Sequence, residues 1–156
     1  MAKDIEISWD TDLMEGDFGF ENNDLVSDEG LETAVVISLF TDRKADEDDI
    51  LPDPDGSKRG WWGDLGSGIE NDQIGSKLWL LEREKTTEET LVRAKQYIFD
   101  ALQWMIDDGI TNKIEVDVER QGSITPILAF LVKIYKNTTI LNISFNEQWE
   151  AQENAI

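Results

Sequence analysis

The chain has 156 residues, of which 34 are acidic and 14 basic, and it contains neither histidine nor cysteine. Its formal net charge of -20 at pH 7 would repel phosphate backbones and anionic membranes, so we expect no nucleic-acid or membrane partner. The commonest general base, the thiolate nucleophile and the usual zinc ligands are missing, and we expect no cofactor. The length predicts one domain over residues 1–156 that can bury a core. With no apolar run near 18 residues and no signal-peptide pattern at its start, we expect a soluble protein made in the cytosol.

The N-terminal part, residues 1–27, is predicted to form short strands and a hairpin. Ile5, Ile7 and Trp9 alternate with polar residues, which is the pattern of a half-buried strand. A second extended piece follows and meets a turn-forming ENND sequence at 21–24. This order of extended pieces and turn residues favours a hairpin.

A first helix is predicted over residues 29–40, where apolar side chains recur at helical spacing from Leu31 onward. Ser27 or Asp28 is the predicted N-cap. The β-branched run at 35–37 lowers the helix propensity. We therefore expect tertiary packing to hold this helix.

A second helix is predicted over residues 87–108. Thr86 and Glu89 have the spacing of a capping box, with Thr86 as the N-cap. The apolar stripe consists of Leu91, Ala94, Ile98, Ala101, Leu102 and Met105. Gly109 is placed to end the helix in the left-handed conformation.

Three strands are predicted after the second helix. Residues 114–118 and 140–145 alternate between apolar and polar, and residues 127–136 form an apolar run rich in β-formers. The turn between the last two strands is predicted at 137–139, and a short tail at 146–156. The element order predicts an α+β fold with helices packed on one face of an antiparallel sheet.

A long connection rich in glycine and aspartate is predicted over residues 44–76, with adjacent tryptophans, Trp61 and Trp62, near its middle. Three interpretations of this pair stay open. One ring packs into the core over the second helix, or the pair docks onto another protein, or it stacks on a sugar or base. Trp79 and Trp104 are predicted to be core residues, and the apolar run around Trp79 is a helical turn or a strand.

Carboxylates offer two further hypotheses. Asp64, beside the tryptophans, with Asp42 or Glu70 as its partner, would suit a cell-wall glycosidase, which needs two carboxyl groups across a cleft. The DPDGS sequence at 53–57 resembles the start of a calcium loop but lacks the distal glutamate, so an acidic flexible loop is the simpler interpretation. The charge also allows an acidic mimic of nucleic acid.

Four stretches, in this order, resemble the Mu-like prophage baseplate protein 46 family: LETAVVISLFTDR at 31–43, RGWWGD at 59–64, GSKLWLL at 75–81 and ALQW at 101–104. That family is similar to the sheath-initiator wedge proteins of contractile phage tails. The resemblance implies a structural protein without enzymatic activity, assembled in the host cytoplasm and present in several copies in the virion tail baseplate. It would lie around the tube, bind the wedge subunit and seed the sheath by strand pairing.

Two sets of residues are therefore predicted to contact other proteins. The loop set is Arg59, Trp61, Trp62 and Asp64, and the strand set is Thr139, Leu141, Ile143 and Phe145. Strand pairing needs an edge strand that is open to a partner, and the alternative is an edge protected by its charged neighbours.

The sheath-initiator group carries a Glu-Pro-Arg type motif after its first helix, where this chain has Thr41, Asp42 and Arg43. By that resemblance Arg43 is predicted to form an internal ion pair. Glu119 with Arg120 is an alternative location for such a pair.

Overall fold

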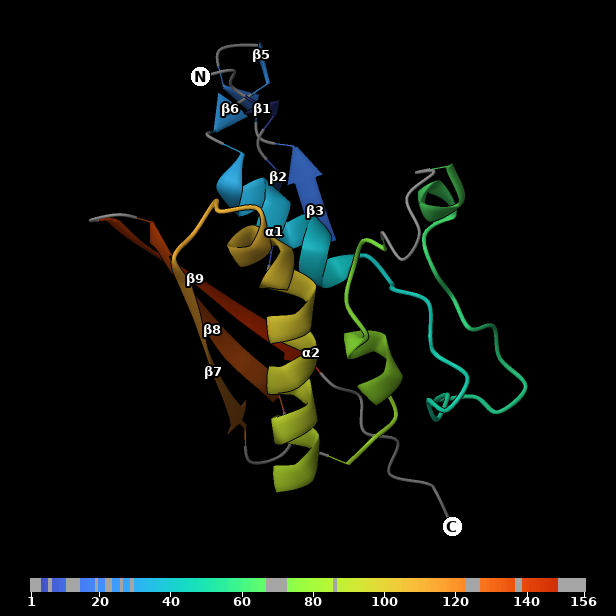
Figure 1. The fold of residues 1–156 in the computed structure, drawn as a ribbon. Coiled ribbons are helices and arrows are strands. Elements are labelled where there is room, and N and C mark those ends of the chain that lie inside the picture. Colours follow the sequence, from blue (N-terminus) through green and yellow to red (C-terminus); the bar gives the residue numbers. More distant parts are fainter. Residues whose placement is uncertain are drawn as a thin grey trace.

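The computed structural model describes residues 4–5, 7–10, 15–18, 20–21, 24–25, 27–28, 30–66, 73–85, 87–122, 127–136 and 139–148 (Figure 1). In this part of the chain, two α-helices lie against a three-stranded antiparallel sheet, and three short two-stranded ladders precede the first helix. The predicted α+β class is confirmed. No helix among these residues is long and apolar enough to cross a membrane.

The sheet contains β7 (Lys113–Gln121), β8 (Ile127–Lys136) and β9 (Thr139–Gln148). β8 is central and pairs antiparallel with both neighbours, so that Val132 lies opposite Val116 on one side and Ile143 on the other. All three predicted strands are present. β7 and β9 each run three residues beyond their predicted ends, and the first residues of the predicted tail therefore belong to β9.

Helix α1 (Leu31–Phe40) begins after Gly30, whose φ of 79° lies in the left-handed region. The predicted N-caps are wrong, because Ser27 and Asp28 form the short strand β6 instead. Glycine takes this conformation without the steric cost that a β-carbon brings, so the chain can turn from β6 directly into the helix.

Helix α2 (Glu88–Asp107) begins one residue later than predicted. Its N-cap is Thr87, whose hydroxyl oxygen accepts a hydrogen bond from the Thr90 amide at 3.2 Å. The predicted cap, Thr86, lies outside the described residues, and the capping-box assignment to Thr86 is wrong. At the other end Gly109 has a φ of 70°, the left-handed conformation that the sequence predicts.

The core lies between the sheet and the two helices, with α2 crossing one face of the sheet in Figure 1. The predicted apolar stripe of α2 faces this core, and only Leu91 of its six members is incompletely buried. Phe40 at the end of α1 contacts the ring of Phe145 with 5.3 Å between centroids. Each fully buried Leu, Ile or Phe contributes about 2 kcal/mol to the free energy of unfolding.

The short ladders pair β1 (Asp4–Ile5) with β6 (Ser27–Asp28), β2 (Ile7–Asp10) with β3 (Glu15–Phe18), and β4 (Phe20–Glu21) with β5 (Asp24–Leu25). The last of these confirms the predicted hairpin. The backbone amide of Ile7 donates to the Thr33 hydroxyl at 3.0 Å. This bond attaches the N-terminal strands to α1.

The long connection between the helices contains two 3-10 turns, η1 (Trp62–Gly66) and η2 (Leu78–Leu81). The apolar run of η2 is therefore a helical turn, and its four side chains are buried. Between α1 and η1 the chain extends away from the helices as a loop and then returns toward η2 (Figure 1).

Candidate functional site

The long connection has two parts with different roles, which we call the loop base (residues 41–45, 59 and 75–82) and the loop tip (residues 61–66). At the base the two ends of the connection run side by side. The Arg43 amide donates to the Ser76 carbonyl and the Ser76 amide donates to the Thr41 carbonyl, both at 2.9 Å. Gly75 has a φ of 104°, and a β-carbon there would lie 2.3 Å from the Thr41 carbonyl oxygen. Only glycine fits this position.

Arg59 connects the outgoing loop to the base. Its guanidinium forms two hydrogen bonds of 2.9 Å to the Glu82 carboxylate and one of 3.0 Å to Asp42. The guanidinium carbon lies 4.6 Å from the centroid of the Trp79 ring, a cation–π geometry. The bonds to Glu82 and Asp42 raise the pKa of Arg59 despite its partial burial. Arg59, which we predicted to contact a partner, is thus engaged within its own chain.

Lys77 forms salt bridges with the acidic segment of the loop, residues 46–49. Its ammonium group lies 2.5 Å from Asp46 and 2.6 Å from Asp49, and its side chain is only 16% exposed. Burial alone would lower the pKa of Lys77, but the hydrogen bonds to both carboxylates raise it. The ammonium group therefore offsets part of the repulsion between these two carboxylates.

Trp79 is the buried anchor of the base, as predicted. It is 5% exposed and packs in a small cluster with Ala45 and Leu80. Its indole nitrogen donates to the Arg43 carbonyl at 2.8 Å, so burial leaves the N–H paired.

The loop tip exposes its large apolar side chains. Trp62 is 80% exposed, Leu65 92% and Trp61 41%. The two indole rings contact each other with 5.5 Å between centroids. Gly63 lets the Trp61 ring lie against the backbone, because a β-carbon at that position would be 2.1 Å from the ring. The interpretation that one ring packs into the core is therefore wrong.

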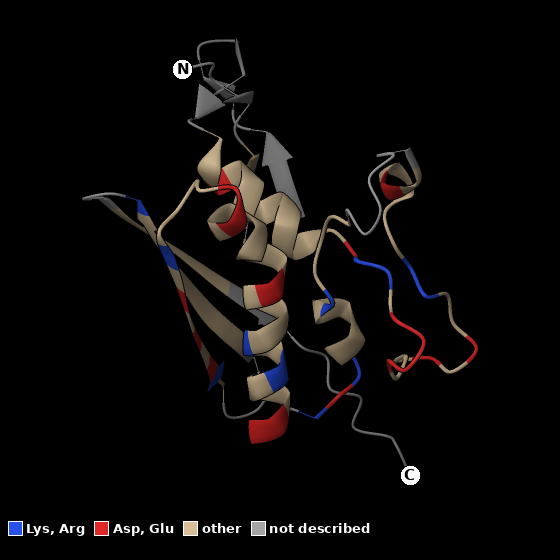
Figure 2. Cartoon of the chain, viewed as in Figure 1, with Lys and Arg blue, Asp and Glu red and all other residues tan. Residues whose placement is uncertain are grey.

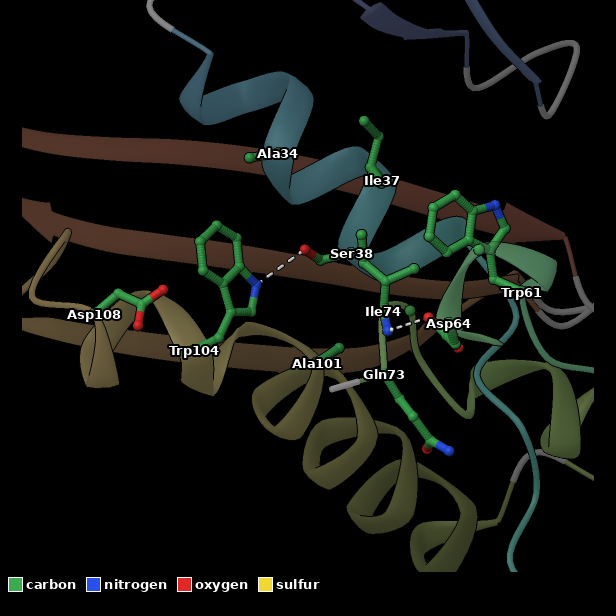
Figure 3. Close-up of a pocket in the computed structure, with 12 residues that line it drawn as sticks. Ala34, Ile37, Ser38, Trp61, Asp64, Gln73, Ile74, Ala101, Trp104 and Asp108 are labelled. Carbon is green, nitrogen blue, oxygen red and sulfur yellow. Dashed lines mark hydrogen bonds between the residues drawn. The ribbon is translucent and has the colours of Figure 1, made fainter. Parts of the chain in front are cut away.

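An apolar groove separates the loop tip from the two helices (Figure 3). Its volume is about 400 Å³. Trp104 lines the groove and is 37% exposed, which contradicts its prediction as a core residue. Its indole nitrogen donates to the Ser38 hydroxyl of α1 at 3.1 Å, and this bond fixes the ring at the helix–helix junction.

The carboxylates of the glycosidase hypothesis bond to different partners. Asp42 pairs with Arg59, and Asp64 accepts a hydrogen bond from the Ile74 amide at 3.1 Å. Glu70 lies outside the described residues. Asp64 thus holds the segment that returns from the tip, so this predicted contact residue also has a structural role.

The DPDGS stretch forms a tight turn. The Gly56 amide donates to the Asp53 carbonyl at 2.9 Å, and the Asp53 carboxylate accepts from the Asp55 amide at 3.2 Å. Within the described ranges, His, Cys, Asp and Glu form no group of three or more that could hold a metal ion.

The strand residues predicted to contact a partner lie on β9. Ile143 and Phe145 are buried in the core, and Leu141 is partly buried. Thr139 opens the strand opposite Lys136. Burial therefore removes the side chains of Ile143 and Phe145 from contact with another protein, and leaves the backbone of β9 and the exposed side chains on its other face.

Arg43 lies in the loop base, and its predicted internal ion pair stays a prediction. Its Nε donates to the Gln73 side-chain oxygen at 3.2 Å. Among the ion pairs of the described residues, Arg59 bonds to Asp42, the residue before Arg43, and to Glu82.

The sequence reasoning missed several residues of this site, among them Ile37, Ile74, Lys77 and Glu82. One signal was available for Ile37. A helix that is apolar on more than one side needs more than one apolar neighbour, and α1 carries Val35, Val36 and Ile37 in succession. The charge partners at the base gave no comparable signal because acidic residues are abundant throughout the chain.

The chain matches the model of a family described as phage protein GP46 over residues 31–139. It is 44% identical to baseplate protein gp46 of Escherichia phage Mu over 117 residues, which cover 75% of this chain and 77% of the Mu protein. It is 35% identical to the Mu-like prophage FluMu protein gp46 of Haemophilus influenzae over 136 residues, covering 87% and 90% of the two chains. The matched region spans both helices, the loop base, the loop tip and the first two sheet strands.

Proposed function

Since the chain belongs to the phage protein GP46 family, it is a structural component of the virion tail baseplate, and we propose that it seeds the sheath through β9 and binds a wedge subunit through the loop tip. These roles need contacts and no catalysis. Several copies would surround the tube, and a charge of -20 on each copy would disfavour their association outside the baseplate.

The observation that carries the sheath proposal is a difference between the two outer strands of the sheet. β7 contains five charged residues, namely Lys113, Glu115, Asp117, Glu119 and Arg120. β9 has no charged residue from Thr139 to Asn146. Proteins protect an edge strand from pairing by placing charged side chains on it. β7 is therefore protected, and β9 is suited to accept a further strand.

The length of β9 supports the same assignment. It spans ten residues, and among the described strands it pairs with β8 alone. Its buried side chains, Ile143 and Phe145, anchor β9 to the core. The backbone at its outer edge can then pair with a strand of another protein.

The test is capture of purified sheath protein by variants of the full chain. Ser144→Lys places a cation on the exposed face of β9, and Gln121→Lys places the same charge on the exposed part of β7. We expect the β9 variant to capture several-fold less sheath, whereas the β7 variant behaves like the parent. Equal capture by both variants, with unchanged circular dichroism, would contradict pairing through β9.

The wedge proposal rests on the exposed apolar side chains of the loop tip. Trp is enriched in the residues that dominate binding energy at interfaces, and Trp62 and Leu65 are almost fully exposed in this chain. The loop base holds the tip in place through Arg59 and Lys77, so the tip is presented by a fixed support.

Trp62→Ala should reduce binding to the wedge subunit by at least about tenfold, since loss of one central aromatic side chain commonly costs 2 kcal/mol or more. Val92→Ala is the matched control, because Val92 is also exposed but lies on α2 away from the tip. The proposal fails if the two variants bind equally well.

A further inference from the structure

The groove between the loop tip and the helices has an apolar centre. Four large side chains converge on it, and all are partly exposed: Ile37 at 37%, Trp61 at 41%, Ile74 at 36% and Trp104 at 37%. They come from α1, the tip, the returning loop and α2 (Figure 3). A space of about 400 Å³ among them is large enough for one or two side chains of another protein.

The charged side chains in the described lining of the groove are all acidic. Asp64 and Asp108 lie at opposite ends of the set of side chains in Figure 3, and the described lining contains no Lys or Arg. Asp108 is exposed, whereas Asp64 is partly buried. An incoming segment therefore meets an apolar centre between two carboxylates.

The end of α2 adds to this negative potential. The C-terminus of a helix carries a partial negative charge, which basic side chains in the last turn usually offset. The last turn of α2 has no basic residue and ends with Asp107 and the C-cap Asp108. Figure 2 shows acidic residues at this end of the helix, beside α1. Without a partner, this arrangement is electrostatically unfavourable, and a bound cation would relieve it.

We propose that the groove binds a positively charged amphipathic segment of a neighbouring baseplate subunit. An apolar side chain of that segment enters between Trp61 and Trp104, and Lys or Arg residues on either side of it pair with Asp64 and Asp108. The exposed indole faces also favour cations. The inference rests on the proposed docking of the loop tip, and it adds the chemistry of the partner.

Charge selects this occupant over a second copy of the chain. Another copy would bring a further charge of -20 to an acidic groove, and like charges across an interface oppose binding. An acidic or uncharged segment would leave the exposed Asp108 carboxylate and the negative end of α2 without a cation at the edge of the contact.

The test places a photo-crosslinker in the groove of assembled tails. Ile37 is replaced by p-benzoylphenylalanine, tails are purified and irradiated, and the crosslinked peptides are identified by mass spectrometry. The same replacement at Gln73, on the groove lining, serves if the residue at 37 perturbs folding. Val92, exposed on α2 outside this groove, is the control position.

We expect crosslinks from positions 37 and 73, but not from 92, to one segment with Lys or Arg on both sides of an apolar residue. Asp108→Asn should lower the crosslink yield at least about fivefold relative to Asp53→Asn, which removes the same charge from an exposed turn away from the groove. Crosslinks to an acidic segment or to a second copy would overturn the inference, as would equal yields for the two variants.

Two negative results are distinguishable. If the chain is present in purified tails but gives no crosslink from either groove position, the inference fails and the baseplate role stands. If the chain is absent from the tails, the proposed function fails, and the inference fails with it.

Discussion

The base and the tip of the long connection use tryptophan in opposite ways. At the base, Trp79 is 5% exposed, its N–H is paired and a guanidinium covers its ring. At the tip, Trp62 is 80% exposed and its main described aromatic neighbour is Trp61. The first arrangement stabilises the fold, and the second leaves a large apolar surface for another molecule. The same connection therefore contains one tryptophan that stabilises the fold and another that is available to a partner.

This separation predicts the largest difference between two tryptophan variants. Trp79→Ala should lower the free energy of unfolding by about 3–5 kcal/mol, because it leaves a cavity and removes a buried hydrogen bond. Trp62→Ala should change it by less than about 0.5 kcal/mol, since the side chain is exposed. Urea unfolding of both variants measures the difference, and similar losses in the two would contradict the assignment.

The base also depends on one glycine. Gly75→Ala should lower the free energy of unfolding by about 2–3 kcal/mol, because alanine combines an unfavourable φ with a clash against the Thr41 carbonyl. Gly109→Ala is the control, since Gly109 also has a positive φ but its β-carbon would have no neighbour within 4 Å. That variant should lose only about 1 kcal/mol. Both losses can be measured by thermal and urea unfolding. A larger loss of stability in Gly109→Ala than in Gly75→Ala would contradict this prediction.

The ion pairs of Arg59 should contribute less. Both partners are substantially exposed, so Arg59→Ala should lower the free energy of unfolding by about 1 kcal/mol. The loss should shrink at high salt because screening weakens the pairs in the parent protein. Arg83→Ala, at an exposed position in the next turn, is the comparison. A salt dependence identical for both variants would argue against the Arg59 pairs.

The smallest effect concerns Asp49. Burial opposes its ionisation, but the hydrogen bonds from Lys77 and the Asp46 amide outweigh it and lower the pKa of Asp49. A lowered folded-state pKa stabilises the fold above the unfolded-state pKa, and this stability is lost as the pH falls through the folded value. Between about pH 5 and pH 3, the parent should therefore lose up to about 1 kcal/mol more than Asp49→Asn. Acid titrations of unfolding that run parallel for both proteins would contradict this.

Much of the fold could be predicted from the sequence. The periodicity of α2 and of the three sheet strands is strong because each element has one buried face. The caps were less predictable. Thr86 and Thr87 are both suitable N-caps by residue type, and residue type does not show that the Thr90 hydroxyl bonds back to the Lys85 carbonyl in the turn before α2. Ser27 and Asp28 are residue types that often cap helices, but here they form β6, whose backbone pairs with β1.

The candidate site was only partly predictable. The tip tryptophans stood out because they are large residues in a glycine-rich segment. Trp104 was wrongly placed in the core because it adjoins the apolar stripe of α2, and one-dimensional spacing does not show that this side of the helix faces a groove. The network at Arg59 joins residues 17 and 23 positions away, and local sequence patterns carry no information on such pairs.

The two outer strands of the sheet give the most direct test of the proposed function. Deleting β9 would remove Ile143 and Phe145 from the core, so its role is better tested in the intact chain. Hydrogen exchange of backbone amides, measured with and without purified sheath protein, reports pairing at each edge separately. We predict added protection at β9 between Thr139 and Asn146 and none at β7. Sheath binding that protects β7, or neither strand, would contradict the account.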